Sequence, residues 1–212
     1  MKATNIFKGL GIALITPFKA DGHIDFAALE SITEFQISKG IDFLCILGTT
    51  LKTPCLTDEE KQEVIKTVVN INRNRVPILL GCGSNNTAAV AHYLQTADFT
   101  GIDGALLVCP YYNKPRQEGV YQHFKMLDKV SPLPIVLYNI PGRTGTNISA
   151  ETVLRLAADC QHIVAVKEAS GNIAQIEEIL RHAPEGFGVL SGDDAITLEL
   201  LSAGAQGVIR PW

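Results

Sequence analysis

The stretch His162-Ile-Val-Ala-Val-Lys167-Glu-Ala-Ser-Gly171-Asn172 contains the unit from which the whole chain is built. Its first seven residues form a short, β-branched run that predicts a buried strand, a polar loop follows, and helical periodicity begins after Asn172. The same order of strand, loop and helix recurs along the chain. We expect strands at about 9–17, 43–48, 77–82, 104–109, 134–140, 162–168, 186–191 and 205–209.

Helices are expected between these strands. Their predicted starts follow Asp25, Thr57 (with Glu60 as a capping box), Asn86-Thr87, Ser149, Asn172 and Asp193-Asp194, and a further helix crosses 121–124. Eight strands joined by helices indicate parallel pairing, and eight is the number that closes a barrel. We therefore predict one α/β domain over residues 1–212, a (β/α)8 TIM barrel. An open doubly wound sheet is the alternative, although no Gly-x-Gly-x-x-Gly turn follows a strand.

Composition narrows the class of protein. The 212 residues are 46% hydrophobic with a net charge of −4, which suits a soluble globular domain and provides no basic field for nucleic acid. No apolar run approaches the ~20 residues that span a bilayer, and the N-terminus lacks the apolar core of a signal peptide. We expect a cytoplasmic protein without a membrane or nucleic-acid partner. Five cysteines without a Cys-x-x-Cys pair and five dispersed histidines predict no disulfide, metal or cofactor.

Lys167 is an amine within an apolar strand. A lysine in such a place loses its proton more easily, because burial disfavours the charged form, and the neutral amine is a nucleophile. Two-residue alternation predicts Lys167 on the same face as Ala165 and Ile163, with Val164 and Val166 on the other face. A Schiff-base lysine is the resulting hypothesis. The alternative is a lysine at the end of the strand that reaches water.

The active site of a β/α barrel lies where its strands end, so the residues at those ends form one predicted cluster. Tyr138 is predicted to relay protons to Lys167, and Arg143 to bind a carboxylate. Thr49 and Thr50 can pass a proton or hold a carboxylate. Each has an ordinary alternative: a core tyrosine, a surface ion pair, or turn threonines. Asp193-Asp194 are expected mainly to cap a helix.

Five motifs of the chain resemble one family in order and spacing. They are Gly48-Thr-Thr50, Tyr111-Tyr-Asn-Lys-Pro115, Tyr138-Asn-Ile-Pro-Gly-Arg-Thr-Gly145, Val166-Lys-Glu-Ala-Ser-Gly171 and Leu190-Ser-Gly-Asp-Asp194. The family is that of the pyruvate-dependent class I aldolases, which holds dihydrodipicolinate synthases and N-acetylneuraminate lyases. Arg143 and Thr50 resemble the members that condense pyruvate with L-aspartate-4-semialdehyde to 4-hydroxy-tetrahydrodipicolinate, a lyase step of lysine and diaminopimelate biosynthesis. Sialic-acid lyases typically carry Gly-Ser-Thr and lack that arginine.

The resemblance implies a role for each matching residue. Lys167 would form the imine with pyruvate, and Tyr138 would relay protons through Thr49. Thr50 would hold the pyruvate carboxylate, and Arg143 would receive the carboxylate of the semialdehyde. Two further positions match: Tyr112 would complete the proton relay of a neighbouring subunit, and Ile209 would line the pocket. No cofactor is implied.

Two departures from the family pattern stand out. Leu51-Lys52 replaces the usual Gly-Glu after Gly-Thr-Thr, which puts a base where an acid is expected. The family pattern also continues, past the eighth strand, into an eighth helix and a helical extension, whereas this chain stops at Arg210-Pro-Trp212. We therefore predict a barrel truncated after strand eight, with exposed apolar surface on strands eight and one.

Three functions remain open at this point. The chain is predicted to be a synthase of the type above, another pyruvate aldolase that cleaves a sialic acid or 2-keto-3-deoxy sugar acid, or an inactive truncated barrel. The aromatic pair Tyr111-Tyr112 at the barrel mouth favours a homodimer, because exposed aromatics are enriched at interfaces. In the complete family members, two such dimers commonly form a tetramer.

Overall fold

The computed structural model describes residues 2–49 and 52–211, and its eight parallel strands pair in chain order into a closed barrel. The predicted fold is confirmed. Each predicted strand is present, although the first ends at Ala13 rather than near residue 17. The strands are β1 Gly9–Ala13, β2 Phe43–Ile46, β3 Ile78–Gly81, β4 Gly104–Val108, β5 Ile135–Asn139, β6 Ile163–Glu168, β7 Gly188–Ser191 and β8 Gly207–Pro211.

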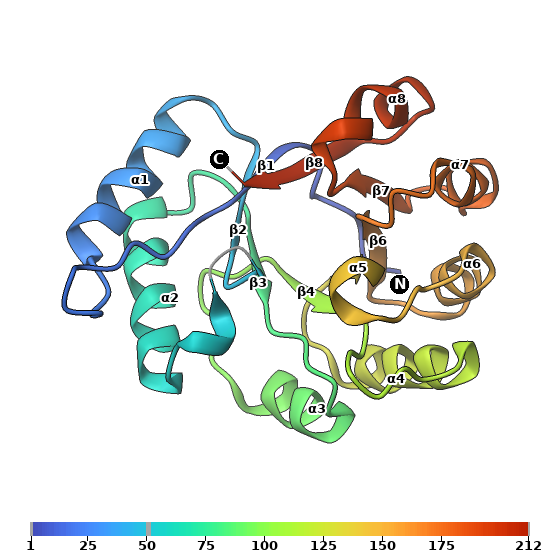
Figure 1. Ribbon diagram of the computed structural model, residues 1–212, viewed down its shortest axis with the longest axis horizontal. Coiled ribbons are helices and arrows are strands. Elements are labelled where there is room, and N and C mark those ends of the chain that lie inside the picture. Colours follow the sequence, from blue (N-terminus) through green and yellow to red (C-terminus); the bar gives the residue numbers. More distant parts are fainter. Residues whose placement is uncertain (1, 50–51, 212) are drawn as a thin grey trace.

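The helices surround the strands (Figure 1). They are α1 Phe26–Ser38, α2 Asp58–Asn72, α3 Thr87–Thr96, α4 Gln117–Val130, α5 Pro141–Thr144, α6 Ala150–Asp159, α7 Ile173–His182 and α8 Thr197–Ser202, with short 3-10 helices η2 Thr53–Cys55 and η3 Asp194–Ile196. The predicted caps are present, including the reciprocal Thr57–Glu60 capping box. Sequence periodicity missed α5 and η2, because a single turn of helix leaves no periodic signal.

Side chains that point inward fill the barrel. Phe7 and Phe43 meet edge to face, with ring centroids 5.4 Å apart. Gly11 and Gly104 leave room for these two rings, since an added Cβ would lie 2.2 Å from Phe43 or 2.5 Å from Phe7. The centre of the barrel is therefore a packed core, as in other β/α barrels.

The predicted alternation along β6 is correct for Val166 and wrong for Ile163 and Val164. Ile163 packs with Val166 in the cluster between the barrel and its helices, whereas Val164 packs with Ala165 in the barrel interior. The reason is a register shift, in which Ile135 pairs with Ile163 but its neighbour Val136 pairs with Ala165. The extra residue reverses the inside–outside order on its N-terminal side. Lys167 still points inward, because it follows the irregularity.

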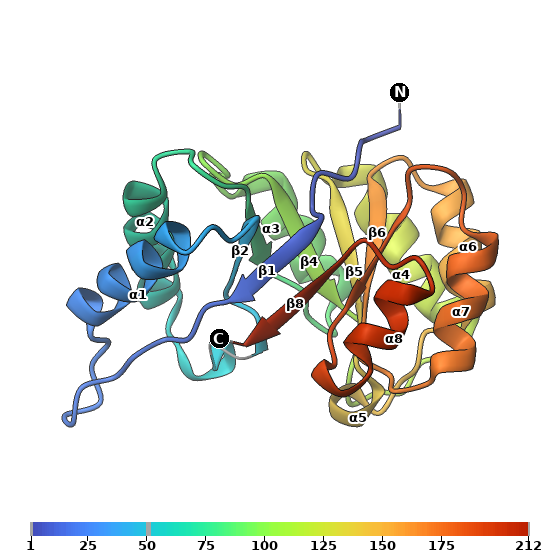
Figure 2. The same ribbon diagram turned by 90° about the horizontal axis from the view of Figure 1, so that it is seen from above.

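The two ends of the barrel differ. Figure 2 shows the strands running toward the end where α5 lies, while the N-terminus lies at the opposite end. Between α1 and α8, no helix of the described residues covers β1 and β8 (Figure 1). Leu10 of β1 is exposed there and Val208 of β8 is half-buried, so part of the expected apolar surface is present. No helix in residues 2–49 and 52–211 is long and apolar enough to cross a membrane.

Candidate active site

Lys167 lies inside the barrel at the carboxyl end of β6. Only 6% of its surface is exposed, so its amine does not reach water as a surface lysine would. It pairs in register with Tyr138 of β5, and its Nζ lies 4.4 Å from the centroid of the Tyr138 ring. Burial lowers the pKa of the amine below its ordinary value of 10.5, and the nearby positive charge of Arg143 adds to this effect. These are the conditions that make a lysine nucleophilic.

Tyr138 is buried beside the amine. Burial raises the pKa of its phenol to about 12, so the hydroxyl keeps its proton at neutral pH. The side chain of Thr49, from the loop after β2, hydrogen-bonds this hydroxyl. Thr49 itself is exposed. The arrangement therefore connects a buried phenol next to the amine with a hydroxyl at the surface of the barrel mouth, as a proton relay requires.

Cys45 of β2 is a further neighbour of this pair, for which the sequence predicted no role in the site. It lies fully buried in the interior cluster that also contains Tyr138 and Ala165. Burial raises the pKa of its thiol to about 11, an effect that the Lys167 charge opposes. The thiol is therefore neutral and contributes packing next to the amine.

Gly192 follows β7 and makes room for the lysine. A Cβ at position 192 would lie 2.8 Å from Lys167 Cε and 3.1 Å from its Cγ. The Gly192 amide donates to the carbonyl oxygen of Glu168 at 2.7 Å, so the backbone at 192 is tied to the strand that carries the lysine. No pattern in the sequence indicates this role of Gly192, because the role depends on a contact between two neighbouring strands.

Arg143 lies on α5, in the loop between β5 and α6. Its side chain is exposed, and its charge is close enough to Lys167 to lower the pKa of the amine. The turn is held internally: Thr144 Oγ1 donates to Thr146 O at 2.8 Å, and Gly145 closes α5 with a φ of +70°. Arg143 is thus an exposed cation close to the buried amine.

The remaining predicted residues are placed as follows. Ile209 of β8 is fully buried in the interior cluster with Tyr138. Tyr112 lies on the loop after β4 with 88% of its side chain exposed and a φ of +73°, which is uncommon for a tyrosine. Among the residues that the structure describes, none covers its ring, so Tyr112 does not join the cluster around Lys167. Thr50 lies outside the described residues.

Lys52, one of the two residues that depart from the family pattern, directly precedes η2, whereas Leu51 lies outside the described residues. Lys52 is exposed with a φ of +52°, and Thr53 Oγ1 donates to Gly48 O at 2.9 Å, which holds the loop after β2. The basic side chain at 52 is therefore in water.

Asp193, in the loop after β7, caps η3 as expected, since its Oδ1 accepts from Ala195 N. Asp194 instead pairs with Arg210 at 3.3 Å.

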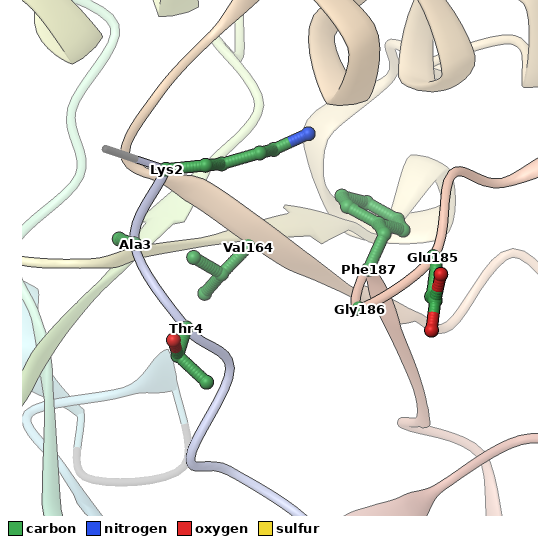
Figure 3. A pocket seen from close by; sticks show the side chains of 7 residues that line it. All are labelled: Lys2, Ala3, Thr4, Val164, Glu185, Gly186 and Phe187. Atoms are coloured by element: carbon green, nitrogen blue, oxygen red, sulfur yellow. The ribbon is translucent and has the colours of Figure 1, made fainter.

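A hollow at the other end of the barrel does not belong to this site. It has a volume of about 210 Å³, and its lining includes Lys2, Val164 and Phe187 (Figure 3). Figure 3 shows the Lys2 side chain running along one side of the hollow, and its Nζ donates to Ala157 O. The hollow lies at the N-terminal ends of the strands. In β/α barrels this end contributes to stability, and the active site lies at the opposite end.

Comparison with known proteins identifies the family of the chain. A model of the dihydrodipicolinate synthetase family matches residues 6–211. The chain belongs to this family. A 4-hydroxy-tetrahydrodipicolinate synthase of Azobacteroides pseudotrichonymphae is 55% identical over 204 residues, which cover 96% of this chain and 69% of that protein.

Solved structures of this family agree with the fold. Dihydrodipicolinate synthase from Aquifex aeolicus superposes with a TM-score of 0.91 at 44% identity, covering 97% of this chain and 70% of that one. A chloride-inhibited dihydrodipicolinate synthase from Acinetobacter baumannii, solved with pyruvate, gives a TM-score of 0.92 at 39% identity over the same shares. The family is thus established over nearly the whole of this chain.

The Gly192 contact predicts the effect of one methyl group. Gly192→Ala is expected to displace the Lys167 side chain and to slow imine formation by roughly tenfold or more, while the barrel stays folded. The measurement is the rate at which pyruvate and borohydride modify Lys167, read by mass spectrometry. Gly119→Ala on α4 is the control, because its added Cβ meets only Pro115. Equal trapping rates for both variants would contradict the assignment.

The lowered pKa of Lys167 predicts a pH profile. Only the neutral amine attacks a carbonyl, so the trapping rate should rise with pH and reach its half-maximum below the ordinary 10.5. A midpoint at or above 10.5 would mean that the amine is solvated.

The lowered pKa of Lys167 also predicts how stability depends on pH. Between the lowered pKa and 10.5, the unfolded chain binds more protons than the folded chain, so the free energy of unfolding rises with pH. Lys167→Met should remove this rise.

Proposed function

We propose that this protein condenses pyruvate with L-aspartate-4-semialdehyde to form 4-hydroxy-tetrahydrodipicolinate, through an imine on Lys167. The observation that carries the proposal is the buried amine of Lys167 against the Tyr138 ring at the mouth of the barrel. Membership of the dihydrodipicolinate synthetase family supports the same reaction. No cofactor is needed, because the lysine itself supplies the electrophilic activation.

The chemistry starts with the neutral amine. Lys167 Nζ attacks the keto carbon of pyruvate, and the resulting carbinolamine loses water to give the imine. Loss of a methyl proton then gives an enamine, whose carbon attacks the aldehyde of the second substrate. The amino group of that substrate closes the ring on the imine carbon and releases the lysine. Each step moves a proton, so a relay beside Nζ is required.

Tyr138 and Thr49 provide this relay in our proposal. A phenol whose pKa is raised to about 12 stays protonated and can donate to the departing hydroxyl of the carbinolamine. The hydrogen bond with Thr49 lets the phenol regain its proton from the barrel mouth. Thr50, by its match to the family motif, is assigned to the pyruvate carboxylate, and Ile209 to the apolar wall of the pocket.

Arg143 is proposed to select the second substrate. Its planar fork binds a carboxylate in two places, and its loop lies directly beyond Tyr138. Aspartate semialdehyde carries such a carboxylate next to its amino group. The second candidate function is cleavage of a sialic acid or a 2-keto-3-deoxy sugar acid. This reaction uses the same imine, but it does not explain why an arginine lies in this loop.

We also propose a homodimer in which Tyr112 completes the proton relay of the partner subunit. An aromatic side chain that is 88% exposed in a backbone conformation with positive φ requires a reason, and insertion into a partner supplies one. Assembly of two dimers into a tetramer is a further proposal that rests only on the resemblance.

A cytoplasmic location completes the proposal. The chain has five cysteines, and all are free thiols, of which Cys45, Cys109 and Cys160 are buried. Thiols kept in this form suit a reducing compartment.

Trapping tests the proposed reaction directly. Borohydride with pyruvate should add a reduced pyruvyl group to Lys167, and Lys167→Ala should show no adduct at any pH. Product formation from pyruvate with aspartate semialdehyde, compared with cleavage of sialic and 2-keto-3-deoxy sugar acids, separates the two aldolase functions. A folded wild-type protein that forms no adduct would identify an inactive barrel.

The role of Tyr138 predicts a separation of activity from stability. Tyr138→Phe should lower turnover by roughly 10²–10⁴-fold, the usual loss for a positioned acid–base group, with little change in the melting midpoint. If the hydroxyl only satisfies a buried partner, the variant should instead lose about 1–2 kcal/mol of stability and keep its turnover. Turnover and thermal melting measured on one preparation distinguish these outcomes.

Complementation tests the shared site. Lys167→Ala and Tyr112→Phe should each be poorly active alone, yet a mixture refolded together should regain roughly a quarter of wild-type turnover, since random pairing leaves that share of sites complete. The control is the same mixture with Tyr111→Phe in place of Tyr112→Phe. Absence of any regain beyond the sum of the single variants would exclude a relay across the interface.

A further inference from the structure

Glu168 is a buried acid that the proposed mechanism does not use. It follows Lys167 in β6 and points to the opposite side of the barrel wall, where 0% of its surface is exposed. Its Oε1 accepts hydrogen bonds from Asn139 Nδ2 at 2.9 Å and from Gln175 Nε2 at 3.3 Å. An acid in this position has no access to substrate, so its burial requires a structural partner.

That partner is the loop that carries Arg143. Asn139, the last residue of β5, pairs in register with Glu168 and stands at the start of this loop. Its Nδ2 also donates to Asn147 Oδ1 at 2.8 Å, and its Oδ1 accepts from the amide of Ile148 at 3.0 Å. One side chain therefore joins both ends of the segment 140–147, in which α5 and Arg143 lie.

Gln175 of α7 closes the network from outside. Asn147 Nδ2 donates to Gln175 Oε1 at 2.7 Å, and Gln175 Nε2 donates to Ile148 O at 3.2 Å. Gln175 Nε2 also donates to Glu168 Oε1. The side-chain amides of this network are therefore oriented by the acceptor oxygen of Glu168. Because Glu168 Oε1 accepts from Asn139 Nδ2, the Oδ1 of Asn139 faces the amide of Ile148 and accepts from it.

The main chain extends the connection to β7. Ala169 N donates to Asn139 O at 2.9 Å, and Gly192 N donates to Glu168 O at 2.7 Å. Glu168 is thus tied to the Arg143 loop by its side chain and to Gly192, which borders Lys167, by its carbonyl. Burial raises the pKa of Glu168 above its ordinary value, and hydrogen bonds from Asn139, Ser170 and Gln175 oppose this rise only in part.

We propose that Glu168 is a positioning residue that holds the Arg143 loop against the strand carrying Lys167, and so sets where the carboxylate of the second substrate binds. This inference rests on the proposed function. If Glu168 has this role, formation of the imine and binding of the second substrate depend on different residues. Imine formation depends on Lys167 and its inner neighbours, whereas binding of the aldehyde depends on the orientation that Glu168 imposes through Asn139.

Glu168→Gln tests the proposal with the smallest change of shape. Asn139, Gln175 and Ser170 all donate to the carboxyl group of Glu168, and the NH2 group of a glutamine can accept none of these bonds, so the loop should lose part of its fixed orientation. We expect KM for aspartate semialdehyde to rise roughly tenfold or more, as for loss of a hydrogen bond to a charged group. The rate of pyruvate trapping on Lys167 should stay within about twofold of wild type. Hydrogen exchange at the Ile148 amide should accelerate.

Two further variants keep the test decisive. Glu178→Gln makes the same chemical change at an exposed position of α7 and should leave all three measurements unchanged. Asn147→Ala cuts the network from the loop side without touching Lys167, and it should reproduce the rise in KM and the faster exchange. Because both changes act on one network, the double variant should be little worse than the more affected single variant.

Several outcomes would overturn the proposal. A fall in trapping that matches the fall in turnover, with KM unchanged, would place the role of Glu168 in the imine site or in the fold. Unchanged exchange at Ile148 in Glu168→Gln, or in Asn147→Ala if the first variant does not fold, would show that the loop is held by other contacts. If the wild-type protein forms the imine but does not use aspartate semialdehyde, the proposed function fails, and the exchange comparison still decides the positioning role.

Discussion

The burial of one amine is the constraint on which this molecule depends. Burial of Lys167 inside the barrel disfavours the charged form of its amine. The pKa of the amine is therefore lowered, and the neutral amine is a nucleophile. Part of the space for it comes from Gly192 at the end of β7, where a single Cβ would clash with the lysine. The packed aromatic core below, around Phe7 and Phe43, leaves the strand ends as the place for chemistry.

The pairing of β5 with β6 serves two purposes at once. Tyr138 and Lys167 are paired in register on the inner side, and Asn139 and Glu168, one residue later, are paired on the outer side. The inner pair brings a phenol and an amine together, and the outer pair anchors the loop that carries a cation. Parallel strands of fixed register thus couple the reacting groups to a binding group.

Where the chain departs from its family, the structure limits the consequences. Lys52 points into water, and Thr53 and Gly48 still hold the loop after β2. The chain spans about 69% of the length of a relative that is 55% identical to it. Within that span the barrel closes through β1 and β8, which pair over five residues from Gly9 with Gly207 to Ala13 with Pro211.

Local patterns in the sequence determined most of the fold. The eight strand runs, the caps at Asp25 and Thr57 and the amine within an apolar strand are all signals carried by a few adjacent residues, and the motifs around them identified the family. Tyr138 and Arg143 could be chosen as candidates because parallel strands end at one face of a barrel.

Tertiary structure decided what depends on contacts between distant residues. The register shift beside Ile135 reversed the predicted positions of Ile163 and Val164, and only the neighbouring strand reveals it. The room that Gly192 leaves for Lys167 and the link from Glu168 through Asn139 to Ile148 join segments that are separate in the sequence. Periodicity reports which way a side chain points relative to its own strand, and it contains no information on which side chain of another strand it meets.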